Sequence, residues 1–170
     1  MVMAKLTLLR FRNKLPGLEV HETIVGYGHE NVLATHRSTI EFTKESHLSR
    51  NGDCILIVSI DKGINDLSKE FKQALRNNNA ELTILIEVGN IVEEIHAQGS
   101  SQLRLNDATE MVIRKSDHIS ERTLAISADK AAKDVSREIV EMLKNPNQQA
   151  KITFIVKKRN EKLLDETIQG

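Results

Sequence analysis

The chain has 170 residues, with 24 Lys and Arg against 24 Asp and Glu, so its formal net charge at pH 7 is zero. A hydrophobic fraction of 39%, with 8 Gly and 2 Pro, excludes a disordered or low-complexity chain. The single cysteine, Cys54, excludes an internal disulfide framework and a Cys-rich zinc site, and it fits a reducing cytoplasm. We therefore expect a cytoplasmic protein with one domain, or two small halves sharing a core.

Residues 1–17 are expected to form an N-terminal extension. Their apolar stretch is interrupted by Lys5 and is far shorter than the roughly 20 residues that a membrane helix needs, so no membrane association is expected. Neutral charge argues against nucleic acid as a partner, because Lys and Arg supply most of the affinity for phosphates. One Tyr and four Phe also leave few rings for stacking on single-stranded bases.

The first predicted strand covers residues 18–25. Alternation of apolar and polar residues predicts a half-buried strand over residues 32–43, on which His36 shares the inward face of Ile40 and Phe42. Residues 54–60 form a short, β-branched apolar run that is typical of a buried strand.

A helix is predicted next, because Ile64, Leu67, Phe71 and Leu75 recur at helical spacing. Alternating residues then predict a strand over 81–88, and the turn Gly89-Asn90 joins it to a second strand over 91–97 in a two-residue hairpin.

An internal repeat relates residues 38–86 to residues 109–156 once two small gaps are introduced. The matched identities are Lys44/Lys115, His47/His118, Ser49/Ser120, Leu56/Leu124, Ser59/Ser127, Asp61/Asp129, Lys62/Lys130, Asp66/Asp134, Ser68/Ser136, Glu70/Glu138, Leu75/Leu143, Asn77/Asn145, Ala80/Ala150 and Thr83/Thr153. Each copy has the order strand–strand–helix–strand.

The repeat predicts an α+β fold in which two units related by a pseudo-two-fold share one mixed sheet or a barrel-like core, since about 60 residues are marginally stable alone. The expected organisation is an N-terminal extension at 1–17, repeat 1 with an added hairpin at 18–97, repeat 2 at 98–157 and a C-terminal tail at 158–170.

Three stretches are similar to one archaeal family, catalogued as domain of unknown function three-seven-one: GYGHENVLATHRSTIEFTKE, GDCILIVSIDK and MVIRKSDHISERTLAISADKAAKD. The resemblance runs from about residue 19 to about residue 156. It implies an archaeal, cytoplasmic protein and implies no activity.

The strongest candidate site residues are Asp61, Lys62, Asp129 and Lys130, which end a strand in SIDK and SADK. In a structural interpretation each Asp caps the following helix. Asp66 and Asp134 could provide the caps instead. The Asp-Lys pairs would then lie in loops at strand ends, where they could line one cleft between the repeats and act in acid–base catalysis.

A second group of candidates is His29, Asn31 and His36. Residues 26–31 have no counterpart in the second copy, and His36 aligns with Asp107, so this segment could contact a ligand in one half alone. A buried structural histidine is the alternative for His36. The histidine spacing matches no standard metal-ligand motif, so no metal is expected. Gly26-x-Gly28 lacks a third glycine and a following helix, and it predicts a turn.

Two hypotheses for function follow. In the first, the protein binds a small polar or anionic ligand in a cleft between the repeats, with or without catalysing a reaction. The sequence identifies neither a reaction nor a cofactor. The second is a non-catalytic module that binds protein or RNA through a sheet edge or helix face. A homo-oligomer is compatible with both. Cys54 is interpreted as a small core residue and not as a nucleophile.

Overall fold

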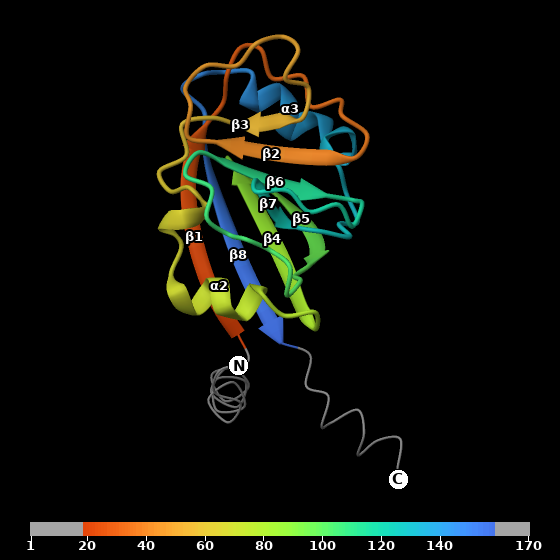
Figure 1. Ribbon diagram of the computed structural model, residues 1–170. Coiled ribbons are helices and arrows are strands. Elements are labelled where there is room, and N and C mark those ends of the chain that lie inside the picture. Colours follow the sequence, from red (N-terminus) through yellow and green to blue (C-terminus); the bar gives the residue numbers. More distant parts are fainter. Residues whose placement is uncertain (1–18, 159–170) are drawn as a thin grey trace, which may run out of the picture.

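A computed structural model describes residues 19–158 as two four-stranded sheets with short helices (Figure 1). In chain order the elements are β1 (Glu19–Tyr27), β2 (Thr39–Thr43), β3 (Ile55–Ile57), the 3-10 helix η1 (Ile64–Asp66), α2 (Lys69–Leu75), β4 (Ala80–Val88), β5 (Ile91–Gln98), β6 (Glu110–Arg114), β7 (Thr123–Ala125), the 3-10 helix η2 (Ala132–Asp134), α3 (Arg137–Leu143) and β8 (Gln149–Lys158). The expected extension at 1–17 and the tail after residue 158 lie outside the described residues.

The first sheet has the strand order β1-β8-β4-β5 and is antiparallel throughout. The second has the order β3-β2-β6-β7, with an antiparallel β2–β6 pair at its centre and β3 and β7 parallel to their neighbours. Each sheet therefore combines strands from both halves of the chain: β8 inserts between β1 and β4 in the first, and the pair β3-β2 lies beside the pair β6-β7 in the second. The α+β class is confirmed. The predicted single mixed sheet and the barrel-like alternative are both wrong, because the strands form two sheets whose edges are joined only by the isolated bridges Tyr27–Val58 and Gln98–Ile126 within residues 19–158.

The core lies between the two sheets and is centred on three phenylalanines. Phe154 on β8 lies 6.4 Å from Phe42 on β2 and 6.1 Å from Phe71 on α2, measured between ring centroids. All three side chains are fully buried. Helix α2 crosses the first sheet on the side that faces the second sheet (Figure 1). None of the helices formed between residues 19 and 158 has the length and apolar character needed to cross a bilayer.

The β4–β5 hairpin confirms the sequence prediction. Gly89 occupies the turn with φ of +59°, a conformation that glycine adopts without a steric penalty. The alternating residues Leu82, Ile84 and Ile86 are buried on the inner face, as their period of two predicts.

The strand predicted over residues 32–43 is wrong in its first half. Only Thr39–Thr43 pairs as β2. Residues 32–38 form a loop because Ala34 has a left-handed φ of +50°, which interrupts an extended chain. His36 therefore lies in this loop, half-buried, and not on the inner face of a strand.

The helix predicted from Ile64 to Leu75 is divided into two pieces. The 3-10 helix η1 ends at Asp66, and α2 begins only after its N-cap Ser68, whose hydroxyl accepts a hydrogen bond from the N–H of Phe71. The four apolar residues of the predicted helix are nevertheless buried together.

Candidate functional site

Asp61 and Asp129 hydrogen-bond to the outer strands of the first sheet. One carboxylate oxygen of Asp61 accepts the N–H of Val25 at 2.9 Å, while the N–H of Asp61 donates to the carbonyl of Val25 at 3.0 Å. Asp129 makes the same two bonds with His96, both at 2.9 Å. Each aspartate thus satisfies backbone groups at a sheet edge, and the prediction that it caps a helix is wrong.

Asp66 and Asp134 cap the 3-10 helices from within, and not the longer helices as the alternative interpretation expected, since the N-caps of α2 and α3 are Ser68 and Ser136. Asp66 accepts the N–H of Gly63 at 2.8 Å, and Asp134 accepts that of Ala131 at 2.9 Å. These backbone hydrogen bonds are the main reason that the pKa of each carboxyl is lowered.

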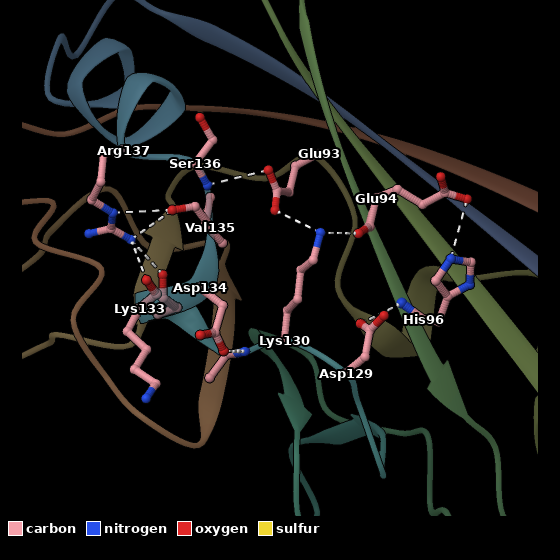
Figure 2. Close-up of polar contacts among 12 residues, drawn as sticks. Glu93, Glu94, His96, Asp129, Lys130, Lys133, Asp134, Val135, Ser136 and Arg137 are labelled. Carbon is pink, nitrogen blue, oxygen red and sulfur yellow. Dashed lines mark hydrogen bonds and ion pairs between the residues drawn. The ribbon is translucent and has the colours of Figure 1, made fainter.

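Lys62 and Lys130 each pair with a largely buried glutamate. Figure 2 shows the amino group of Lys130 between the carboxylate of Glu93, at 3.1 Å, and the carbonyl oxygen of Glu94, at 2.8 Å. The equivalent pair joins Lys62 to Glu22 at 3.5 Å. Both lysines therefore have a carboxylate partner within the protein.

The same two glutamates also bind the helix N-termini. Glu22 accepts the N–H of Ser68 at 2.6 Å, and Glu93 accepts that of Ser136 at 3.3 Å. A carboxylate at this position stabilises the positive end of a helix. Strand, lysine and helix are thus linked by one side chain in each half.

The two Asp-Lys pairs do not line one cleft. Asp61 bonds to β1 and Asp129 to β5, and these are the two outermost strands of the first sheet. Strands β8 and β4 lie between them, which separates the pairs by roughly 14 Å across the sheet at the usual strand spacing. Val25 is in register with Val92, four residues from His96, which adds roughly 13 Å along the strands. The structure brings each Asp together with its own Lys and places the pairs at opposite edges.

His29 and His36 form local hydrogen bonds. Nδ1 of His29 accepts the N–H of Asn31 at 3.0 Å, and the side-chain amide of Asn31 donates to the carbonyl of Leu48 at 2.8 Å. Nδ1 of His36 accepts the N–H groups of Ser38 and Thr39, both at 3.1 Å. No group of three His, Cys, Asp or Glu side chains between residues 19 and 158 could hold a metal ion.

Asp61→Ala and Asp129→Ala are each expected to lower the free energy of unfolding by about 1 kcal/mol, because each change removes the acceptor for an edge-strand N–H. Urea denaturation followed by circular dichroism measures the loss, with the exposed loop variant Asp117→Ala as a control. If either variant matches the wild type in stability, the contact is dispensable and a functional role for that aspartate gains support.

A cluster of charged residues that was not predicted from the sequence lies on the outward face of the second sheet. Glu41 of β2 is 5% exposed, and its carboxylate accepts the thiol hydrogen of Cys54 at 3.2 Å. Arg122 lies 3.8 Å from Glu41 and donates to Glu110 of β6 at 2.7 Å. The β2–β6 pairing joins the two halves of the chain, so the cluster lies at their junction.

Burial governs the electrostatics of this cluster. Loss of water raises the pKa of Glu41, and the thiol of Cys54 and the neighbouring charges modify that shift. Burial and the adjacent Glu41 raise the pKa of Cys54 to about 12, so the thiol is protonated at neutral pH and is not an activated nucleophile. The protonated thiol agrees with the expectation that Cys54 is not a nucleophile, but the predicted core position is wrong, because Cys54 is half-buried and lies outside the hydrophobic core.

Arg114 completes the cluster and is held by hydroxyl groups. Its Nε donates to Thr123 at 2.9 Å and its Nη2 to Ser120 at 3.0 Å. Within residues 19–158 no carboxylate forms an ion pair with Arg114. Burial lowers the pKa of this guanidinium, Arg122 adds to the effect, and the charge of Glu41 opposes it. Arg114 and Arg122 therefore share one sheet face with the carboxylate of Glu41.

A polar groove of about 420 Å³ lies over the β4–β5 edge of the first sheet. It is lined by Glu81, Leu82, Thr83, His96, Ala97, Gln98, Ser127, Asp129 and Lys157. Asp129 is the one predicted site residue on this lining. Side chains of both charge signs surround the groove, so it has no evident preference for anions or cations.

Comparisons with known proteins place the chain in a family. A family model described as "Domain of unknown function (DUF371)" matches residues 24–157. An uncharacterised protein of the archaeon Methanocaldococcus jannaschii is 50% identical over 117 residues, which cover 69% of this chain and 86% of that relative. The predicted resemblance is confirmed, and the chain belongs to the DUF371 family of unknown function.

Proposed function

We propose that the protein binds a small anion, a phosphate-like or carboxylate group, at the junction of its two halves on the outward face of the second sheet. The observation that carries the proposal is Arg114. Its guanidinium is positioned by the hydroxyls of Ser120 and Thr123, and it shares the sheet face with the guanidinium of Arg122, whose charge it senses. A planar guanidinium fixed in this way offers its remaining N–H donors to an anion in a defined geometry.

Glu41 would couple this binding to protonation. With Glu41 and Glu110 both ionised, two carboxylates balance the two guanidiniums. When Glu41 takes up a proton, a positive charge remains, and an anion is attracted. Since burial already raises the pKa of Glu41, proton uptake begins at a higher pH than for an exposed glutamate.

An internal duplication is part of this proposal. The contacts of Asp61 and Asp129, and those of Lys62 and Lys130, match in the two halves. The cluster does not match: the sequence has Glu41 in one half and no corresponding acid on β6, where Val112 lies opposite it. A scaffold repeated in both halves with one differing face supports a specialised site at that face.

A ligand-binding role for the residues predicted from the sequence remains a prediction. Ligand binding or catalysis by Asp61, Lys62, Asp129 and Lys130 would require each to act while holding its structural partner. The same holds for His29, Asn31 and His36, whose described contacts are local.

The proposal is tested by titrating the protein with sulfate at constant ionic strength. Sulfate keeps its charge between pH 5 and 8, in contrast to phosphate. The Arg side-chain Nε–H signals in nuclear magnetic resonance spectra report binding at the site itself. We expect Arg114→Gln to weaken sulfate binding about ten-fold or more, which corresponds to about 1.4 kcal/mol. The matched control Arg104→Gln changes an exposed arginine that pairs with Glu121.

The pH dependence provides a second readout. Sulfate affinity of the wild type should rise as the pH falls through the folded-state pKa of Glu41, which lies above its ordinary 4.5. Glu41→Gln should lose this dependence. Equal sulfate binding by the wild type and Arg114→Gln, or no response of the Arg114 signal, would overturn the proposal.

A further inference from the structure

The outward face of the first sheet is uncovered within residues 19–158, since α2 and the second sheet pack on its other side. The residues at its centre are uncharged. Ile155 and Thr153 on β8 lie beside Thr83 and Leu85 on β4, and all four side chains are partly exposed. An uncharged centre is typical of the core of a protein–protein interface.

Charged residues lie at the two ends of this face in alternating order. Near one end Lys157 on β8 lies opposite Glu81 on β4, and near the other Lys151 on β8 lies opposite Glu87 on β4. The amino group of Lys151 is 3.8 Å from the carboxylate of Glu87. Lysines therefore lie on one central strand and glutamates on the other.

The charge pattern decides between two ways in which a second copy could stack face to face on this sheet. In both, the two-fold axis is parallel to the plane of the sheet and lies midway between the two copies. With the axis perpendicular to the strands, Lys157 faces Lys151 of the second copy and Glu81 faces Glu87, so like charges meet. With the axis parallel to the strands, between β8 and β4, each lysine of one copy faces the glutamate in the same row of the other. Only the second arrangement is electrostatically favourable.

We propose that this face is the interface of a homodimer. Its two-fold axis runs parallel to the strands, between the two stacked sheets and above the gap between β8 and β4. Aligned sheets pack within about 30° of each other, and long Lys and Glu side chains can follow that rotation. The groove over β4 and β5 would then face the partner's β1. The anion cluster lies on the other sheet, so this inference and the proposed function fail or succeed independently.

The dimer is expected to dissociate on dilution. Four strands about 4.8 Å apart, with seven residues each at about 3.3 Å, make a face of roughly 19 by 23 Å. This is small for a protein–protein interface, so the association should be measured over a range of protein concentrations.

Charge reversal at Lys151 and Glu87 tests the proposal. Lys151→Glu places four carboxylates together at the two-fold, and Glu87→Lys places four ammonium groups there. Each single variant is expected to raise the dimer dissociation constant about ten-fold or more in sedimentation equilibrium. The double variant restores alternating charges and should return the constant to within about three-fold of the wild type.

A matched charge reversal on α3 serves as the control. Glu141→Lys combined with Lys144→Glu exchanges another exposed lysine–glutamate pair, 2.6 Å apart, away from this face. It should leave the dissociation constant unchanged, and circular dichroism confirms that every variant is folded. A wild type that is monomeric at millimolar concentration, or a double variant no better than the singles, would overturn the proposal.

Discussion

Replacing Phe154 with alanine is expected to lower the free energy of unfolding by about 3–5 kcal/mol. The ring of Phe154 is fully buried and contacts Phe42 of the second sheet and Phe71 of α2. Its removal therefore opens a cavity where three elements meet, and both neighbouring rings lose packing partners. Urea denaturation, with circular dichroism and hydrodynamic radius as two independent probes, measures the change in midpoint at constant slope.

Phe154→Leu separates the loss of volume from the loss of an aromatic ring. Leucine refills most of the space, so a smaller cost of about 1–1.5 kcal/mol is expected. A loss below about 1 kcal/mol for Phe154→Ala would show that the two sheets do not depend on this contact. The slope also matters: a lower slope in the alanine variant would indicate that the layers separate before the chain unfolds.

Local patterns predicted the elements that the structure contains. Residues with a period of two, such as Ile152, Phe154 and Val156 on β8, are buried on one face because a strand alternates its side chains. Glycine at position 89 predicted the β4–β5 hairpin because the turn requires a positive φ. These features depend on neighbouring residues alone, so the sequence is sufficient to identify them.

The candidate site depended on strand pairing that local patterns do not encode. Strand β8 inserts between β1 and β4, and this separates Asp61 from Asp129. The β2–β6 pairing brings Glu41 next to Glu110, which a strand-by-strand analysis treats as solvated residues on unrelated strands. Glu41 and Glu110 each alternate with buried apolar residues along their strands. This pattern indicates a shared charged face only once the two strands are known to be adjacent.

An aspartate that precedes a predicted helix also had two possible roles that the sequence alone did not distinguish. An aspartate just after a strand can cap the following helix or accept a hydrogen bond from an edge strand, because both offer an unpaired N–H. In this protein Asp66 does the former and Asp61 does the latter. Only four residues lie between the two aspartates, and the tertiary position of β1 decides between the roles.

Gly28→Ala and Gly99→Ala are each expected to lower the free energy of unfolding by about 3 kcal/mol. A Cβ at position 28 would lie 2.2 Å from the carbonyl oxygen of Leu143, and one at position 99 would lie 2.1 Å from that of Leu75. Both contacts are with backbone, so a side-chain rotation cannot relieve them. Gly28 and Gly99 therefore make the same kind of close contact with a helix end, which the sequence alignment did not predict.

The two glycines let the chain pass close to the C-terminal ends of α3 and α2, where the following residue can bond to a terminal helix carbonyl. The residue after each glycine donates its N–H to the same carbonyl: His29 to Leu143 at 2.8 Å and Ser100 to Leu75 at 3.1 Å. An alanine would push the strand end away from the helix, and the helix would lose a partner for a terminal carbonyl as well as suffering the clash.

Gly52→Ala is the matched control, because a Cβ there would meet a methyl group of Leu48 at 2.7 Å, and this flexible side chain can move. We expect it to cost about 1 kcal/mol or less. Thermal and urea unfolding of the three variants measure the difference. Comparable losses for Gly28→Ala and Gly99→Ala would mean that the same helix-end contact supports both halves of the fold. A loss at only one of them would mean that the other strand end can shift off its helix, and that the two halves differ in rigidity at this contact.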